Sequence, residues 1–158
     1  MQKQENDLIS PEQAGTLHGL FIERVRRSPQ RVAYRHFDQQ RNQWVDYTWA
    51  QMRDEVARWQ AALICEGLQA GDRVAVMLRN CPQWVMFDQA ALSLGLVVVP
   101  LFTVDRPDNI AYIVNNAGAK VMLFENAEQW HALRTVRSAC HCSTFSNSST
   151  FAPALSTI

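Results

Sequence analysis

The sequence lacks an excess of either charge and any long uninterrupted hydrophobic run, and each absence excludes a class of protein. Fifteen basic and fifteen acidic residues balance, whereas nucleic-acid-binding domains usually show a basic excess or a basic patch. The longest apolar stretch, 90–102, is interrupted by Ser93, Gly95 and Pro100 and is too short to span a bilayer. The N-terminal residues are polar and show no secretory signal. We therefore expect no nucleic-acid partner and a cytoplasmic location.

Cysteine is also scarce, with four in 158 residues. This number fits reduced thiols better than a disulfide framework. The chain is 47% hydrophobic and 19% charged, so it can bury a real core. Its length suits one domain or part of a larger one.

Residues 71–101 predict the unit around which the remaining chain is arranged. Two short apolar runs, 73–78 and 97–101, flank a segment long enough for about three helical turns. Two buried strands joined by a helix form the right-handed βαβ crossover of a parallel sheet. Neither run alternates polar with apolar residues, which is typical of strands covered by helices on both faces.

A flexible leader over residues 1–15 and a helix are predicted before this unit. Thr16 can cap the helix, which ends at Ser28 because the residue before a proline is forced out of helical angles. The densest basic cluster of the sequence lies on this helix and just beyond it: Arg24, Arg26, Arg27 and Arg31. We interpret this cluster as a solvated helix face rather than a binding surface.

A hairpin and a second helix follow. The runs 31–37 and 43–47 are separated by a polar turn and roughly alternate in polarity, which predicts two antiparallel strands with one face in water. Thr48 and Gln51 have the spacing of a capping box, which predicts the start of a long helix. Gly67 is placed to end it.

The strand–helix pattern then repeats. Asn80 is predicted to cap a helix over 84–94, and Asp105 and Asn126 are predicted to cap two later helices. Residues 120–124 form a third apolar run of strand character. The sequence therefore predicts an α/β fold, an incomplete doubly wound parallel sheet of order βαβαβα, preceded by a helix and an antiparallel hairpin.

The character of the sequence changes near Arg137. Residues 138–158 contain no Asp, Glu, Lys or Arg, are crowded with Ser and Thr, and show no helix or strand periodicity. We therefore predict a domain over 16–135 and a divergent or disordered Ser/Thr-rich tail over 136–158. A frameshift or a fragmentary gene model is a hypothesis that would explain this tail.

Two short motifs resemble chemical sites away from the predicted strand ends. Cys140-His141-Cys142 has the residue types of a zinc site, but zinc takes about four ligands and no second pair follows. Gly67 and Gly71 precede a strand, whereas the glycines of phosphate loops follow one. A helix stop and a tight turn explain this glycine pair better.

Two further candidates follow predicted strands, where α/β sheets place ligands. Cys81 lies near a helix start, which can lower the pKa of a thiol, but a buried structural thiol is favoured because no His or acid is patterned with it. Asp105 and Asp108 have a ligand-binding alternative, yet helix capping explains both. We assign to packing the five tryptophans, Trp44, Trp49, Trp59, Trp84 and Trp130. The residues thus predict no catalytic, cofactor-binding or metal-binding side chain.

The stretch 67–102, GLQAGDRVAVMLRNCPQWVMFDQAALSLGLVVVPLF, resembles a known family. It is similar to the Gly-Asp-Arg-Val-Ala, Asn-x-x-Glu-Trp and Leu-Gly-x-x-x-x-Pro-Leu motifs of the AMP-forming, adenylate-forming synthetases, the acyl-CoA synthetase and luciferase superfamily. RVAYRHF and YTWAQM also resemble this family, and 104–130 is similar in particular to long-chain fatty acid–CoA ligases. Gln83 stands where the family often has Glu, and the resemblance ends near Arg134.

This resemblance implies the N-terminal part of an enzyme that joins a fatty acid to ATP, giving an acyl adenylate, and then to coenzyme A. The family stabilises the phosphates with Mg²⁺, a lysine and a Gly/Ser/Thr-rich loop. No residue of this chain matches that loop or another catalytic or nucleotide-contact motif. The resemblance therefore implies an inactive fragment with no site residue and no cofactor of its own, while ATP, Mg²⁺ and coenzyme A belong to the full-length family.

Other functions stay open at this point. The parent ligase is expected to be cytoplasmic or peripherally bound to a membrane, and the fragment is expected to self-associate through an unpaired sheet edge. One alternative is a non-enzymatic α/β binding or interaction module. A nucleotide-binding flavodoxin-like or Rossmann domain is less favoured, because no Gly-rich turn follows any predicted strand.

Overall fold

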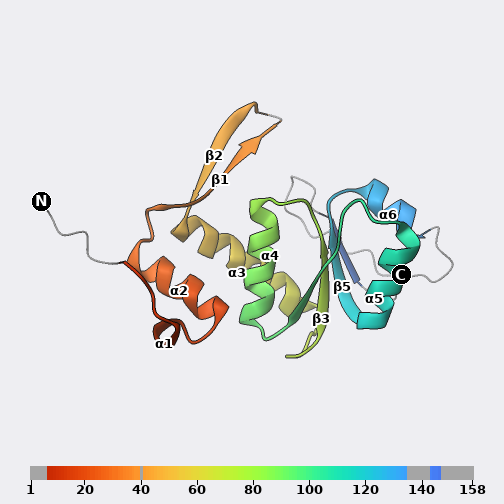
Figure 1. The fold of residues 1–158 in the computed structure, drawn as a ribbon, viewed down its shortest axis with the longest axis horizontal. Helices are drawn as coiled ribbons and strands as arrows, with labels where there is room; N and C mark the ends of the chain where they lie inside the picture. Colours follow the sequence, from red (N-terminus) through yellow and green to blue (C-terminus); the bar gives the residue numbers. More distant parts are fainter. Residues whose placement is uncertain (1–6, 40, 135–142, 147–158) are drawn as a thin grey trace, which may run out of the picture. The chain divides into compact units, whose positions relative to one another are not determined.

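A computed structural model describes residues 7–39, 41–134 and 143–146 (Figure 1). The chain divides into two compact units, Met1–Val56 and Ala57–Ile158. Helix α3 (Trp49–Cys65) spans the boundary between them. None of the described helices has the length and hydrophobicity of a membrane span.

The first unit contains two short helices and a hairpin. These elements are α1 (Pro11–Ala14), α2 (Leu17–Arg27), β1 (Val32–Asp38) and β2 (Gln43–Thr48). The two strands pair antiparallel, which confirms the predicted hairpin. Thr48 Oγ1 accepts from Gln51 N at 3.2 Å and Gln51 Oε1 accepts from Thr48 N at 2.8 Å, which confirms the predicted capping box at the start of α3.

The helix ends of this unit agree in part with the sequence pattern. Thr16 caps α2 through its side-chain oxygen and Ser28 ends it, both as predicted. Helix α1 was not predicted, although Ser10 and Gln13 form a reciprocal capping box around it. The flexibility expected of residues 1–15 stays a prediction.

The second unit is built on a four-stranded sheet of order β4-β3-β5-β6. Its strands are β3 (Arg73–Met77), β4 (Val97–Pro100), β5 (Ala119–Phe124) and β6 (Ser143–Ser146). All three neighbouring pairs are parallel. Between the strands lie α4 (Pro82–Ser93), α5 (Pro107–Ala117) and α6 (Ala127–Arg134). The predicted α/β class and doubly wound order are therefore confirmed.

Strand β6 lies in the Ser/Thr-rich tail, where the sequence shows no strand periodicity. It pairs with β5 along the sheet edge, with Thr144 beside Met122 and Phe145 beside Leu123. A strand added to an existing edge gains its backbone hydrogen bonds from the neighbouring strand, so it needs no hydrophobic period of its own. The remainder of 136–158 lies outside the described residues, and its disorder stays a prediction.

Helices cover both faces of the sheet. Helix α4 lies on one side of it, and α5 and α6 lie on the other (Figure 1). Ala75 and Met77 of β3 belong to a buried cluster with residues of α5 and α6, whereas Val74 and Val76 alternate with them and are also fully buried. This burial on both faces is why the strands show no polar alternation.

Two helix starts differ from the prediction. The N-cap of α4 is Cys81 rather than Asn80, and the N-cap of α5 is Arg106 rather than Asp105. In both helices a proline occupies the first position and holds the residue before it in an extended conformation. The residue directly before the proline therefore becomes the cap. Asn126 behaves as predicted, since its Oδ1 accepts from Gln129 N at 3.0 Å at the start of α6.

Asp72 is a buried charged residue at the amino end of β3, with only 9% of its surface exposed. Its Oδ2 accepts from Gln69 N and from Lys120 Nζ, each at 2.8 Å. The amide of Gln69 and then the ammonium of Lys120 lower the pKa of this carboxyl below its ordinary value. The pair joins the turn before β3 to β5.

The substitution Asp72→Asn is expected to lower the Tm most near neutral pH. Because the pKa of Asp72 is lower in the folded than in the unfolded chain, the carboxylate stabilises the fold above about pH 4. This stabilisation is lost as the pH falls through the folded pKa. Thermal unfolding of both chains at about pH 7 and about pH 3 tests this, with the Tm difference shrinking in acid. Asp54→Asn, at a carboxylate whose side chain is 61% exposed, is the control. A Tm difference for Asp72→Asn that is independent of pH would contradict the electrostatic explanation.

Candidate functional site

The carboxyl ends of β3, β4 and β5 open onto one edge of the sheet. The pairs Val76 with Pro100 and Met77 with Phe124 align these ends. Open α/β sheets bind ligands at such an edge. We define this carboxyl edge as the residues that follow the three strands, namely 78–81, 101–106 and 125–126.

An ion pair links two of these strand ends. Arg79 follows β3, Glu125 follows β5, and Arg79 Nε lies 2.8 Å from Glu125 Oε1. The arginine side chain is 63% exposed and the carboxylate 25% exposed. The backbone N–H of Glu125 donates to Gln129 Oε1 at 2.8 Å, which ties this strand end to α6. The pair is therefore held in place from the protein side while its guanidinium faces water.

Cys81 lies half-buried on the same edge, at the N-cap of α4. Burial raises the pKa of its thiol and outweighs the amides of Trp84 and Gln83, which act in the opposite direction. The alternative of a lowered pKa at the helix start is therefore wrong. A thiol that stays protonated at neutral pH is a poor nucleophile, so the structural interpretation is favoured.

The residues after β4 combine exposed apolar side chains with locally paired carboxylates. Phe102 is 81% exposed and Val104 is 92% exposed. Asp105 accepts hydrogen bonds from the backbone N–H of Arg106 at 2.8 Å and from the side-chain amide of Asn109. Asp108 accepts from Arg106 Nη2 at 3.0 Å. Neither carboxylate caps α5, whose N-cap Arg106 has no side-chain cap bond, so the interpretation of Asp105 and Asp108 as capping residues is wrong. Both are instead held by Arg106 and Asn109 at the start of the helix.

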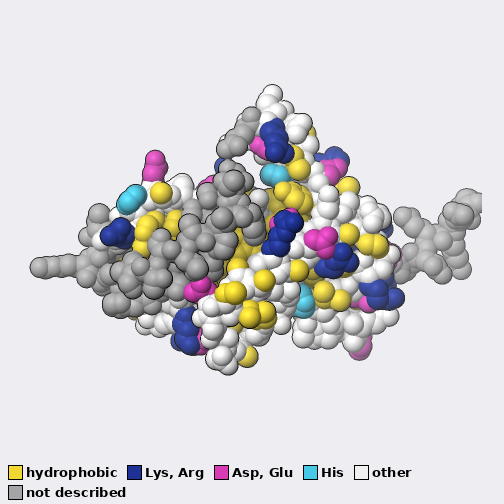
Figure 2. Space-filling view, turned by 180° about the vertical axis from the view of Figure 1, so that it is seen from behind, with side chains coloured by type: hydrophobic (Ala, Val, Ile, Leu, Met, Phe, Trp, Pro, Cys, Tyr) yellow, Lys and Arg dark blue, Asp and Glu magenta, His cyan; other side chains and the backbone are white. Residues whose placement is uncertain are grey.

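On the face that Figure 2 presents, charge does not separate by sign. Figure 2 shows Lys and Arg side chains interspersed with Asp and Glu, and hydrophobic side chains among them, on the face that it presents. This mixture agrees with the balance of fifteen basic and fifteen acidic residues. The carboxyl edge offers two exposed guanidinium groups, those of Arg79 and Arg106, together with exposed apolar side chains. These groups suit positioning of an anionic or apolar group better than proton transfer.

The arrangement of this sheet and its sequence both match one family. A family model described as AMP-binding enzyme matches residues 21–155. The chain belongs to the AMP-binding enzyme family. This confirms the resemblance to adenylate-forming synthetases.

Two curated relatives of this chain are named as ligases. The probable CoA ligase CCL6 of Humulus lupulus is 30% identical over 84 residues, which cover 53% of this chain and 13% of that protein. The long-chain-fatty-acid–CoA ligase of Bacillus subtilis is 35% identical over 91 residues, which cover 56% of this chain and 15% of that protein. The chain therefore spans a small part of the length of the curated relatives it matches.

A solved structure has a similar fold. The Mycobacterium tuberculosis fatty acyl CoA synthetase superposes with a TM-score of 0.70 at 26% sequence identity. The match covers 79% of this chain and 24% of that chain. The α/β layer of this chain is thus the layer found in N-terminal adenylation-domain structures.

The glycine pair Gly67 and Gly71 lies at the opposite edge of the sheet. Gly67 has a φ of 68° after α3, and the backbone N–H of Gly71 donates to Gly95 O at 2.8 Å before β3. Both glycines precede the amino end of β3, so their amides do not face the carboxyl edge. The interpretation as a helix stop and a turn is favoured over a phosphate loop.

The remaining candidates are a metal-ligand motif and the tryptophans. No group of three or more His, Cys, Asp or Glu side chains suited to a metal exists among the described residues, and Cys140-His141-Cys142 lies outside them. Trp59 packs on Phe87, and Trp130 stacks on Phe124, in agreement with the packing role. Trp44 is 65% exposed but packs edge to face on Phe37 of the hairpin, with ring centroids 5.5 Å apart, which also agrees with a packing role.

Sequence reasoning missed the Arg79–Glu125 pair. Neither residue belongs to a motif, and the two follow strands that are separated in sequence by α4, β4 and α5. The only available signal was their common position directly after predicted buried strands, which places polar residues at the same sheet edge.

Proposed function

We propose that this chain is the N-terminal part of a long-chain fatty acid–CoA ligase. In that reaction a fatty acid carboxylate attacks the α-phosphorus of ATP, giving an acyl adenylate and pyrophosphate. The thiol of coenzyme A then attacks the acyl carbon and AMP leaves. The observation that supports this proposal is the family match over residues 21–155, together with relatives that are fatty acid–CoA ligases.

The role proposed for this chain in such a ligase is scaffold. Its carboxyl edge supplies the ends of three aligned parallel strands, while Cys81 stays protonated and Asp105 and Asp108 are engaged by α5. The sequence contains no Gly/Ser/Thr-rich loop followed by a lysine that would stabilise the charge on transferred phosphates. ATP, Mg²⁺ and coenzyme A would therefore be held by parts of a ligase that these residues do not include.

The isolated chain is expected to release no pyrophosphate from ATP. The assay supplies ATP, Mg²⁺, coenzyme A and a long-chain fatty acid such as palmitate, and follows pyrophosphate with a coupled enzyme. The Bacillus subtilis long-chain-fatty-acid–CoA ligase in the same assay is the positive control. A rate above the no-enzyme blank that depends on the fatty acid would contradict the scaffold role.

A second experiment tests whether this chain is part of a longer ligase. The DNA that follows codon 158 is translated in all three frames and searched for a Thr-Ser-Gly-Thr-Thr-Gly-like loop. Finding this loop supports a longer ligase even if the chain alone is inactive. An inactive chain whose downstream DNA encodes no such loop in any frame would favour the non-enzymatic interaction module.

Location and self-association remain parts of this proposal. The cytoplasmic or peripheral membrane location comes from the parent family. Self-association is supported by the exposure of Phe102 and Val104 beside β4, whose outer edge has no strand partner among the described residues. An unpaired edge with apolar neighbours favours contact with other chains.

A further inference from the structure

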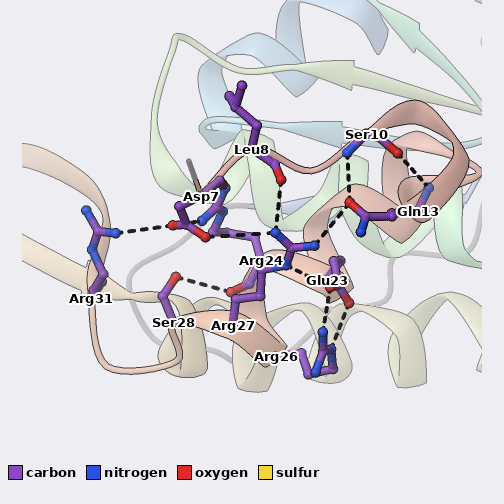
Figure 3. Close-up of polar contacts among 10 residues, drawn as sticks. All are labelled: Asp7, Leu8, Ser10, Gln13, Glu23, Arg24, Arg26, Arg27, Ser28 and Arg31. Carbon is purple, nitrogen blue, oxygen red and sulfur yellow. Dashed lines mark hydrogen bonds and ion pairs between the residues drawn. The ribbon is translucent and has the colours of Figure 1, made fainter. Parts of the chain in front are cut away.

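Three arginine side chains converge on one carboxylate in the first unit (Figure 3). We propose that Arg24, Arg27 and Arg31 form a binding site for a phosphate group, and that Asp7 occupies this site from within the chain. We call these three residues the arginine site. The proposal does not rest on the ligase assignment.

In the arginine site, one carboxylate lies among three guanidinium groups. Arg24 Nη1 forms a short ion pair with Asp7 Oδ2. Arg31 Nη1 lies 3.4 Å from the same oxygen, and Arg27 Nη1 lies 4.0 Å from Asp7 Oδ1. Guanidinium groups match carboxylate and phosphate oxygens with the same fork of N–H donors, so an occupant of either kind fits.

Two of the arginines are held in position by further contacts. The side chains of Arg24 and Arg27 are each only 22% exposed. Arg24 Nη2 donates to Asp7 O at 2.8 Å, and Arg27 donates to Leu8 O at 2.9 Å and to Gln13 Oε1 at 3.1 Å. The segment from Asp7 to Gln13 therefore covers the arginines, and its departure would free donors that already point to one place.

The charges around this site do not balance. Arg26 and Arg27 hold the pKa of Glu23 at about 2, so this carboxylate is ionised at neutral pH and is already shared by two arginines. The cluster thus holds four guanidinium groups against the two carboxylates of Glu23 and Asp7, an excess of two positive charges, and Asp7 contacts Arg24, Arg27 and Arg31. A phosphate monoester carries about −1.5 to −2 charges and three acceptor oxygens, and thus complements the arginine site better than one carboxylate does.

The covering segment has a second attachment that is independent of charge. A Cβ atom added at Gly19 would lie 1.9 Å from Ala14 O, so α1 packs directly on the backbone of α2 at this point. Gly19→Ala must therefore push α1 away without changing any charged residue. The two attachments allow Asp7 to be removed from the arginine site in two different ways.

The test is a titration of the full chain with inorganic phosphate at constant ionic strength. Binding is followed by NMR shifts of the arginine Nε–H groups and by hydrogen exchange of the Ala14 and Gly15 amides, which are bonded within α1. We expect saturable binding with faster exchange of these two amides as the segment leaves. Added sodium chloride should weaken binding, because exposed charges are screened.

The variants separate a binding site from a structural ion pair. Asp7→Asn and Gly19→Ala should each bind phosphate about fivefold more tightly than the native chain, since each removes the internal competitor. Arg31→Gln should bind phosphate about threefold more weakly than the native chain. Because the Arg31 side chain is 74% exposed, this substitution should leave the fold intact. Arg53→Gln, at an exposed arginine paired with Asp54, is the matched control and should bind as the native chain does.

Two arms distinguish the source of the phosphate. One uses inorganic phosphate and the other uses vesicles of phosphatidylglycerol, with phosphatidylcholine vesicles as the control. Preference for phosphatidylglycerol vesicles that Arg31→Gln removes would assign the site to a lipid headgroup. Phosphate binding that is weak, unsaturable and equal in all variants, without vesicle binding that depends on Arg31, would overturn the proposal. An affinity for phosphate that neither Asp7→Asn nor Gly19→Ala changes would also overturn the proposal.

Discussion

Replacing Phe87 with alanine is expected to lower the free energy of unfolding by about 3–5 kcal/mol. The ring is fully buried and meets Trp59 edge to face, with centroids 5.5 Å apart and planes at 89°. Its removal takes away the transfer free energy of the ring and leaves a cavity between α3 and α4 that the neighbours fill only in part. Equilibrium denaturation of the full chain by urea measures the loss.

The matched control for this substitution is Phe102→Ala. It deletes the same ring at a position that is 81% exposed, so the free energy of unfolding should change by less than about 0.5 kcal/mol. Similar losses for Phe87→Ala and Phe102→Ala would contradict the placement of Phe87 in the core of the second unit. A gain in solubility of Phe102→Ala would instead agree with the self-association proposed for this surface.

Replacing Gly118 with alanine is expected to cost about 2–4 kcal/mol, because two penalties add. Gly118 ends α5 in the left-handed region with φ 61°, which an L side chain adopts only with strain. The new Cβ would also lie 2.8 Å from Arg73 Nη2. Arg73 donates to Ala117 O at 2.7 Å and to Gly118 O at 3.2 Å, so the displaced guanidinium would lose bonds that satisfy the carbonyls at the end of the helix.

Gly67→Ala separates these two penalties. Gly67 has a φ of 68°, and a Cβ there would meet nothing within 4 Å. This variant should therefore cost only the left-handed strain, about 1–2 kcal/mol, and the excess for Gly118→Ala measures the displacement of Arg73. Equal losses at both positions, compared by urea denaturation under one set of conditions, would show that Arg73 moves aside at no cost.

The helix starts show how far local patterns extend. Thr16, Thr48 and Asn126 were predicted as caps and their side chains accept the expected backbone bonds. Asn80 and Asp105 were wrong by one residue, because the proline at the first helical position decides the geometry of its predecessor. Capping depends on atoms within one helical turn, so the cap can be predicted from the sequence. A proline at the first helical position must be considered first, because it makes the residue before it the cap.

The candidate site was less predictable than the fold. The sequence placed Cys81 and Asp105 at strand ends, but the environment that raises the pKa of the thiol and the bonds that engage the carboxylate appear only with the packed chain. The pairing of Arg79 with Glu125 likewise depends on β3 and β5 being neighbours although β4 lies between them in sequence. Strand order, not sequence distance, decides which polar residues meet at the carboxyl edge.

The family was identified from the resemblance of residues 67–102 to its motifs. Local periodicity and turn chemistry were enough to define the hairpin, the helices from α2 onward and the first three parallel strands. These features depend on neighbours three or four positions away and on residues such as Gly67 with special backbone angles. The tertiary structure alone decided that β6 joins β5 and that Asp7 lies among the arginines of α2. Both contacts join segments that are distant in sequence. The first is made by backbone hydrogen bonds at a strand edge and the second by single charged side chains, and neither leaves a periodic signal along the chain.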